Sequence, residues 1–362
     1  MENDHNIIKD FFTSHPFPNA FDVETLITKG LRYTYDLQDE IKYIFPDDIT
    51  KKIKNVLVIG CGYNELIYHC LRNPKIKFVG VDFLDSVENH INSSLNTKNF
   101  KFIKDDFMNL GDEKFDIIIA SDVVNFTVNP KESISFLNTI LEDQGALILS
   151  LPSSYYYSSV DLVKSKFDFL NFNYQNDNDV DTAFTLVKNL IQVHPSRINI
   201  YEPRKSSWIS REDFIYRFMT PYNHSYNIYE LFDLFEDTDL FFQNWFDNAG
   251  YYPKAFLWDK NPDLPKINEK FLNKDHLDIW DTVLTLKGPF TSVQKHTFCL
   301  RKNIDLNFFR NFINNDKSFV YTRPNQIISE NTTITSTLLA RTNYKRTLLP
   351  NEALVLDNLK KP

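Results

Sequence analysis

Short apolar runs alternate with stretches of helical periodicity between Val56 and Pro152. The five runs with strand character are VLVIG (56–60), KFVGVD (77–82), FKFIKDD (100–106), FDIIIASDVV (115–124) and GALILSLP (145–152). Helical spacing of apolar residues marks the stretches ELIYHCLRN (65–73), SVENHINSSL (86–95) and ESISFLNTIL (132–141). Continuous apolar runs are typical of strands buried on both faces of a parallel sheet. The alternation therefore predicts an α/β fold with a Rossmann-like, doubly wound sheet.

The rest of the chain divides around this core. We expect an N-terminal arm or lid (1–50), the core (51–154), a mainly helical substrate-side insertion (155–228), the remainder of the sheet (229–302) and a small appended C-terminal domain of winged-helix type (303–362). The insertion contains the helical patterns 181–194 and 210–219. In the remainder we predict helices at 229–240 and 267–286 and strands at 241–247 and 296–302, which close the sheet with an antiparallel edge.

Composition and charge exclude several classes of function. The formal net charge of −8 and the absence of Lys/Arg runs longer than a pair argue against nucleic acid as a partner. Three cysteines without a CxxC motif indicate a reduced protein, and the scattered histidines predict no metal site. The polar N-terminus carries no signal-peptide pattern, and no apolar window is long enough to span a membrane. We therefore expect a cytoplasmic protein.

Three candidate binding elements follow successive strands. Gly60-Cys61-Gly62 ends the first strand, and glycines there let a ligand approach the backbone beside a helix N-terminus. Asp82 ends the second strand, where a carboxylate can accept both hydroxyls of a ribose, and Asp106 ends the third. Each also has a structural reading, since tight strand-to-helix turns use glycine in any case. Together they predict a nucleoside crevice at the carboxyl edge of the sheet.

The sequence of the glycine loop bears on the choice between a nicotinamide dinucleotide and S-adenosylmethionine as the cofactor. A dinucleotide-binding loop needs GxGxxG, and the last glycine is missing from Gly60-Cys61-Gly62-Tyr63-Asn64-Glu65. The motifs VLVIGCGYNE (56–65), GVDFLDSV (80–87), FIKDDF (102–107) and FDIIIASDVV (115–124) resemble, in order and spacing, those of class I S-adenosylmethionine-dependent methyltransferases. Two positions depart from that pattern, with Val58 where the family commonly has an acid and Asn64 where it has a third glycine.

The resemblance implies a role for each motif residue. Gly60, Cys61 and Gly62 would line the methionine side of S-adenosylmethionine, and Asp82 would bind its ribose. Asp106 would meet the adenine amino group beside the backbone N–H of Phe107. The neighbouring candidates for cofactor contacts are Phe83, Asp105 and Ser121.

Two flanking segments extend the resemblance. FFTSHPFPNAFDVETL (11–26) is similar to the PFPN-type entry segment of some bacterial methyltransferases, and Phe17 within it could cover the cofactor or contact the substrate. The alternative is an arm that only packs on the sheet. Residues 210–245 are similar to a region of bacterial methyltransferases, with the rickettsial protein-lysine methyltransferases as more distant relatives.

Candidates for the methyl-acceptor side come from the segments expected to reach the crevice. Asn125 follows the fourth strand, and His224 is the candidate base because imidazole titrates near neutral pH. Tyr222 and Tyr226 flank His224 and could shape an aromatic substrate pocket. Structural alternatives are a capping Asn125 and a surface His224 with packing tyrosines. His296, at the start of the last predicted strand, reads as structural.

Methyl transfer depends on near-attack geometry and needs a base only for a protonated acceptor. The sequence predicts methylation of an O, N or C nucleophile of a small metabolite, with S-adenosylhomocysteine as the product. A protein-lysine acceptor, a non-catalytic S-adenosylmethionine-binding sensor or partner subunit, and a dinucleotide-dependent oxidoreductase stay as alternatives. A homodimer is left open.

Overall fold

The computed structural model describes residues 2–29, 37, 41, 44–48, 50–193, 201–202, 207–208, 210–246, 248–251, 270–271, 274–288, 291 and 293–303, with three short strands in the C-terminal part. Residues 1–37 and 50–304 group as one compact unit. Residues 38–49 and 305–362 form another. The backbone of the second unit includes a three-stranded antiparallel sheet of β10 (Ile327–Glu330), β11 (Thr333–Ser336) and β12 (Lys345–Thr347). The winged-helix expectation stays a prediction.

A seven-stranded sheet is the centre of the first unit, in the order β3-β2-β1-β4-β5-β9-β8. Its strands are β1 (Asn55–Ile59), β2 (Lys77–Asp82), β3 (Phe100–Lys104), β4 (Phe115–Ser121), β5 (Leu141–Pro152), β8 (Leu240–Trp245) and β9 (Lys295–Lys302). The first five strands are parallel, and β9 is antiparallel to both of its neighbours. The predicted doubly wound α/β fold is confirmed.

The position of the antiparallel strand differs from the prediction. We expected an antiparallel strand at the edge of the sheet, but the antiparallel strand β9 lies between β5 and β8, and β8 forms the edge. Burial explains this order. Six consecutive residues of β9 are buried, as a strand with a neighbour on each side requires, whereas β8 is buried only at its two ends.

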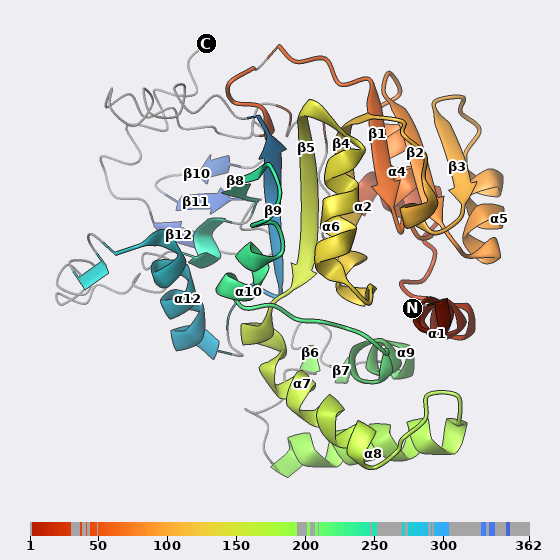
Figure 1. Ribbon diagram of the computed structural model, residues 1–362. Helices are drawn as coiled ribbons and strands as arrows, with labels where there is room; N and C mark the ends of the chain where they lie inside the picture. The colour runs from red at the N-terminus through yellow and green to blue at the C-terminus, as the bar shows by residue number, and fades with distance from the viewer. Residues whose placement is uncertain are drawn as a thin grey trace. The chain divides into compact units, whose positions relative to one another are not determined.

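Helices follow the strands as the periodicity predicts, in α4 (Glu65–Arg72), α5 (Asp85–Ser94) and α6 (Pro130–Thr139). In Figure 1, α6 lies in front of the sheet and α5 flanks it at the β3 edge. One later prediction was too long, because the helix expected at 229–240 is α10 (Ile228–Asp233) followed by turns. Of the helix expected over 267–286, residues 267–269 lie outside the described residues and 270–271 are helical. The helix α12 (His276–Lys287) then begins after Asp275, whose side chain accepts the N–H of Leu277 at 2.8 Å.

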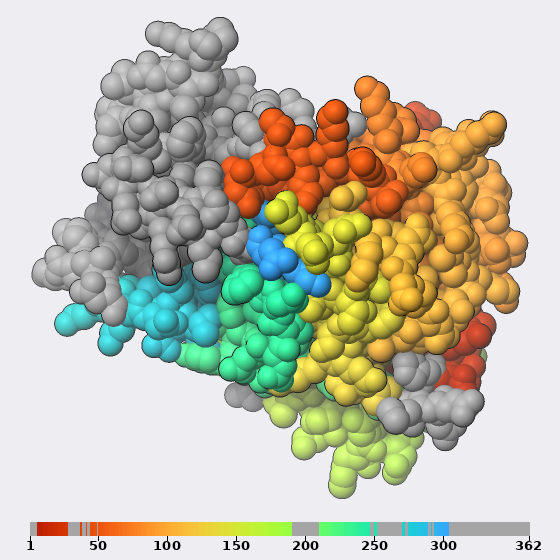
Figure 2. All heavy atoms as spheres, turned by 45° about the horizontal axis from the view of Figure 1, so that its top comes forward, coloured from red at the N-terminus to blue at the C-terminus, as the bar shows by residue number. Residues whose placement is uncertain are grey.

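The insertion begins directly at the carboxyl end of β5. It consists of α7 (Ser154–Phe169), α8 (Asp177–Val193), the short strands β6 (Tyr201–Glu202) and β7 (Ser207–Trp208), α9 (Arg211–Phe214) and a π-helix, η3 (Ile215–Met219). Figure 1 shows α7, α8 and α9 gathered at one end of the sheet. In Figure 2 the light-green residues of the insertion project from the lower edge of the molecule. The insertion is mainly helical, as expected.

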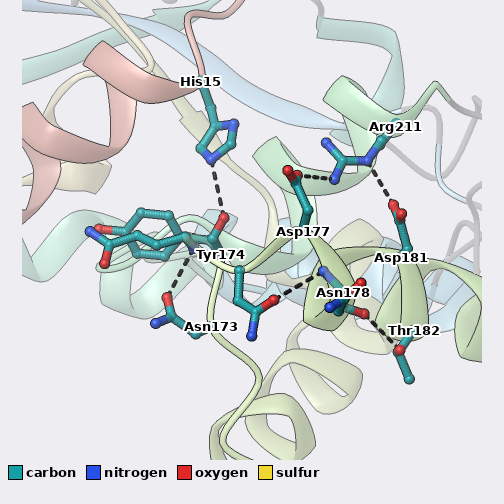
Figure 3. A network of polar contacts seen from close by, with 10 residues as sticks. His15, Asn173, Tyr174, Asp177, Asn178, Asp181, Thr182 and Arg211 are labelled. Atoms are coloured by element: carbon teal, nitrogen blue, oxygen red, sulfur yellow. Dashed lines mark hydrogen bonds and ion pairs between the residues drawn. The ribbon is translucent and has the colours of Figure 1, made fainter.

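The N-terminal arm contains α1 (Glu2–Ser14) and α2 (Val23–Lys29), joined by residues 15–22, which we call the α1–α2 connection. Phe11 of α1 is fully buried in an apolar cluster with residues of α7, α8, α9 and η3. His15 bonds to the Tyr174 carbonyl oxygen at 3.2 Å through Nε2, as Figure 3 shows. The arm is therefore packed against the insertion as well as the core.

No helix in the described part of the chain combines the length and the apolar character that crossing a bilayer would require.

Candidate cofactor and acceptor site

The glycine loop after β1 depends on backbone conformations that glycine adopts without strain. Gly60 and Gly62 have φ values of 54° and 50°. A Cβ on Gly60 would lie 2.4 Å from Cγ2 of Val123, so the loop presses directly against the residues that follow β4. A Cβ on Gly62 would meet only the Gly60 oxygen, at 4.0 Å. A side of the Gly62 backbone is thus free of protein atoms, and the cofactor role of the loop stays a prediction.

The side chain of Cys61 packs against β2 in the protein interior. Its side chain is buried, and its Sγ would lie 3.2 Å from a Cβ placed on Gly80 of β2. Burial, together with the negative charge of Asp82, raises the pKa of this thiol well above its usual value. The thiol therefore stays protonated and apolar in character, and Cys61 can contribute to the predicted site only through its backbone.

Asp82 is brought to the glycine loop as the topology predicts. Its Oδ2 accepts the N–H of Gly62 at 3.0 Å, and its Oδ1 accepts the N–H of Leu84 at 3.1 Å. Burial raises the pKa of the carboxyl group, and the backbone donors oppose that rise. A carboxylate has about four lone-pair positions, so the backbone donors leave capacity for a ligand's hydroxyl.

The residues after β3 have mixed roles. Asp106 is half-buried and caps the short helix η1 (Phe107–Asn109), accepting the N–H of Met108 at 2.9 Å. Asp105 is exposed and accepts from Nδ2 of Asn109 at 2.8 Å. Phe107 is buried in the main apolar cluster, so its backbone is the part available for binding. Phe83, after β2, is half-buried. The cofactor roles of these residues stay predictions.

Ser121 donates to Oε1 of Glu65 at 2.9 Å, and Glu65 is 8% exposed. This buried carboxylate was not predicted from the sequence. Its only sequence signal is a place in the first turn of the helix after Gly62, which is also a common place for a solvent-exposed acid. Glu65 is thus a second buried carboxylate beside the loop, in addition to Asp82, in a chain that has Val58 where the resembling family commonly has an acid.

Asn64, the other departure, holds the N-terminal arm. It is 4% exposed, its Oδ1 accepts the N–H of Phe21 at 2.8 Å, and its Nδ2 donates to the Asn19 carbonyl at 2.9 Å. Phe17 is half-buried and stacks on Tyr216 of η3, with the ring centroids 4.2 Å apart. The structure thus places Phe17 between the arm and the insertion. Whether it contacts a substrate stays a prediction.

Three predicted acceptor-side residues come together at the carboxyl ends of β4 and β5. Asn125 lies in η2 (Val124–Phe126), and its carbonyl accepts the N–H of His224 at 3.0 Å. Its Nδ2 donates to Oδ1 of Asn223 at 3.0 Å. The N–H of Tyr226 bonds to the Pro152 carbonyl at 2.9 Å, which continues the pairing of β5. Backbone hydrogen bonds therefore fix 221–226 beside η2.

The side chains of this segment differ in character. His224 retains an exposed surface, and partial burial with the nearby charge of Lys164 lowers the pKa of its imidazole. A neutral imidazole at neutral pH suits a base. Tyr226 is 6% exposed within the main apolar cluster, and burial raises the pKa of its phenol, so it is not an anion. Tyr222 is exposed with φ 48°.

An ion pair at the same edge was not found from the sequence. Asp122 directly follows β4 with φ 55°, and its Oδ2 pairs with Nζ of Lys295 at the start of β9. The side chains are 18% and 14% exposed. Oδ1 of Asp122 is buried without a hydrogen-bond partner. The pair depends on β9 lying next to β5, which the apolar pattern alone does not specify.

Among the described residues, no group of three or more His, Cys, Asp or Glu side chains is arranged to hold a metal ion.

Known proteins resemble this chain in sequence and in fold. Residues 50–198 match the family model described as "Methyltransferase domain". A probable polyketide synthase of Dictyostelium discoideum (number 22) is 30% identical over 203 residues, which cover 48% of this chain and 8% of that protein. The mitochondrial ubiquinone biosynthesis O-methyltransferase of the same organism is 24% identical over 123 residues, or 30% of this chain and 38% of that protein. The chain thus spans well under half the length of these relatives.

In fold, the chain is similar to PKMT2 from Rickettsia typhi, with a TM-score of 0.57 and 15% identity over 76% of this chain and 54% of that chain. The structure of PKMT2 in complex with AdoHcy gives a TM-score of 0.58 over 79% of this chain and 54% of that one. This likeness supports the Rossmann-like fold described above. The family match and the fold agree with the motif resemblance: residues 50–198 match a methyltransferase domain, and the chain has the Rossmann-like fold of class I methyltransferases.

Proposed function

We propose that the protein transfers a methyl group from S-adenosylmethionine to a hydrogen-bearing oxygen or nitrogen of a small metabolite. The observation that carries the cofactor assignment is the position of Asp82. Its carboxylate accepts hydrogen bonds from the N–H groups of Gly62 and Leu84. It therefore lies near the point where the strand order reverses, between β1 and β4, which is where open α/β sheets bind ligands. PKMT2 of similar fold has been seen in complex with AdoHcy, which supports the same choice of nucleoside.

The residues present fit this cofactor. The open backbone at Gly62 leaves room for it, Asp82 would hold the ribose hydroxyls, and Asp106 with the Phe107 N–H would hold the adenine edge. Glu65 is a candidate partner for the ammonium group of the methionine part, in place of the acid absent at Val58. The cofactor supplies a methyl group activated by the positive charge on sulfur.

Residues after β4 and β5 would hold the acceptor. Asp122 and Asn125 each have a buried oxygen, Oδ1, without a hydrogen-bond partner. Such atoms are uncommon in folded proteins and are explained when a ligand donates to them. Gly60 packs on Val123, so these oxygens belong to a turn in direct contact with the cofactor loop. Acceptors with an O–H or N–H fit this chemistry, and the Asp122 carboxylate could receive the proton. His224 is the second candidate base.

The same edge favours a compact acceptor. The ring of Phe17 stacks on Tyr216, and Phe126 packs on Tyr216 with their centroids 6.0 Å apart. This aromatic wall suits a small molecule with apolar parts, and we prefer it to a lysine-bearing peptide. A cytoplasmic location is supported by the three cysteines, which are all free and buried.

Calorimetry on the full chain tests the cofactor assignment. We expect S-adenosylmethionine and S-adenosylhomocysteine to bind with micromolar affinity or better, and NAD not to bind. Asp82→Ala should weaken S-adenosylhomocysteine binding by about tenfold to a hundredfold, because hydrogen bonds to a charged group are lost. Asp85→Ala is the matched control, since Asp85 is an exposed carboxylate paired with Lys104. No binding of either sulfur nucleoside by the wild type, or full affinity in Asp82→Ala, would contradict the assignment.

A further inference from the structure

The N-terminal arm crosses the point where the strand order of the sheet reverses. At one end, the Phe12 ring packs edge-on against Phe126, which lies just beyond the carboxyl end of β4. At the other end, Asn19 and Phe21 are bonded to Asn64, which lies just beyond the carboxyl end of β1. Strands β1 and β4 are the neighbours between which the order reverses. The arm therefore lies across the crevice where open α/β sheets bind ligands.

The Asn64 side chain is matched to this contact. It uses its carbonyl oxygen for the Phe21 N–H and its amide N–H for the Asn19 carbonyl. Aspartate could not donate the second bond, and glycine could make neither. The Asn64 side chain makes no capping bond to its own helix, although Asn64 occupies the N-cap position of α4. Its buried amide thus connects the arm to the cofactor loop and has no capping role.

We propose that Asn64 is a positioning residue that holds the arm closed over the nucleoside site and limits the exchange of cofactor and product. This proposal deepens the proposed function and rests on it. A nucleoside that enters or leaves past β1 and β4 must displace the α1–α2 connection, and the two Asn64 hydrogen bonds oppose that opening. The aromatic contacts of Phe12 and Phe17 with Phe126 and Tyr216 would remain, so loss of Asn64 should increase opening without detaching α1.

Rapid-mixing kinetics with S-adenosylhomocysteine test the proposal, using Asn64→Ala and Asn64→Gly. Glycine is well tolerated at an N-cap, so Asn64→Gly provides a folded variant if Asn64→Ala fails. Both the association and the dissociation rate constants should rise about tenfold, the factor that corresponds to one or two lost hydrogen bonds. A purely structural role would change the unfolding midpoint and could speed dissociation, but it would not speed association.

Asn73→Ala is the matched control. Asn73 is fully buried at the opposite end of the same helix, and its Nδ2 donates to the His69 carbonyl at 3.0 Å. This variant should lose stability and leave both rate constants unchanged. Chymotrypsin digestion gives a second measurement that needs no ligand, because Phe21 is 43% exposed and chymotrypsin cleaves after phenylalanine. Cleavage after Phe21 should be faster in the Asn64 variants than in the wild type or in Asn73→Ala.

The outcomes separate the two proposals. If the wild type binds S-adenosylhomocysteine but association is no faster in either Asn64 variant, the role of Asn64 is overturned and the proposed function stands. If the wild type does not bind, the proposed function fails and the exchange role fails with it. Unchanged cleavage after Phe21 would independently contradict the claim that Asn64 holds the arm closed.

Discussion

Individual residues around the glycine loop explain how an imperfect motif builds an ordered site. Asn64 replaces a glycine but gains two hydrogen bonds to the arm. Val58 replaces an acid, and it is fully buried in the centre of β1, while Glu65 brings a carboxylate to the loop from the next helix. Each departure is accompanied by hydrogen bonds at or beside the loop, made by Asn64 in one case and by Glu65 in the other. The loop geometry itself therefore depends mainly on Gly60 and Gly62.

Gly60→Ala tests that dependence. An alanine at φ 54° is strained, and its Cβ would lie 2.4 Å from Cγ2 of Val123, so the loop or the turn after β4 must move. We expect a loss of about 2 kcal/mol in the free energy of unfolding in urea. Binding of S-adenosylhomocysteine should weaken as well.

Gly111→Ala is the control for this change, because a Cβ at Gly111 would meet nothing within 4 Å. Its free energy of unfolding should stay within about 0.5 kcal/mol of the wild type. Wild-type stability and affinity in Gly60→Ala would show that the turn after β4 tolerates a side chain there.

Among the elements, the insertion has an apolar core of its own. Phe214 of α9 is fully buried, with ring centroids 5.0 Å from Phe184, 5.1 Å from Phe218 and 6.1 Å from Phe167. Ion pairs of Arg211 with Asp177 and Asp181 connect α9 to α8 at the surface (Figure 3). Exposed pairs of this kind contribute little to stability, so the aromatic packing holds the insertion together.

Phe214→Ala should therefore destabilise the protein by about 3–5 kcal/mol, the range for removal of a buried aromatic side chain. Urea unfolding followed by tryptophan fluorescence and by circular dichroism would measure the loss. Phe169→Ala is matched to it, because Phe169 ends α7 and is 79% exposed. A small effect in Phe214→Ala would mean that the insertion collapses around the missing ring.

The elements of the core could be predicted because each depends on local apolar spacing. β2 has the predicted bounds of Lys77–Asp82, α4 differs from prediction by one residue at its C-terminal end, and α5 differs by one residue at each end. The carboxyl-end positions of Asp82 and Asp106 followed from parallel topology, and the structure brings Asp82 to Gly62.

Other features depend on pairings that local pattern does not contain. The antiparallel strand was expected at the edge of the sheet, and the structure places it inside, because the apolar pattern of one strand does not identify its neighbours. Asp122 and Lys295 meet only because β9 lies beside β5. Asn64 was recognised as a departure, but its contact with the arm joins residues more than forty positions apart. Long-range contacts of this kind decide much of the candidate site.

At the scale of the whole first unit, His296 joins three separate parts of the chain. It is fully buried in β9 and bonds to the Tyr226 carbonyl at 3.0 Å through Nε2. Its Nδ1 bonds to the hydroxyl of Tyr251, in the short helix η4 (Asn248–Tyr251), at 3.0 Å. A neutral ring can donate from Nε2 and accept at Nδ1, which satisfies both partners. Its role in the structure is that of a buried connector.

Stability should therefore depend on pH through His296. Burial lowers the pKa of its imidazole to about 4 in the folded protein, whereas an unfolded chain has a value of about 6.5. The unfolded state then binds more protons between these values, so stability is full above about pH 6.5 and falls as the pH decreases toward 4. The difference corresponds to about 3 kcal/mol, of which about 2 kcal/mol should be lost by pH 5.

Urea unfolding at pH 7.5 and pH 5 measures this loss, with His296→Gln as the reference. Glutamine can hydrogen-bond but does not titrate, so the variant should be less stable at pH 7.5 and lose about 2 kcal/mol less than the wild type on acidification. The difference of differences isolates His296 from the carboxylates, which titrate in both proteins. An equal loss of unfolding free energy in both proteins would show that the His296 ring does not control the acid sensitivity. Other titrating groups would then cause the loss of stability at low pH.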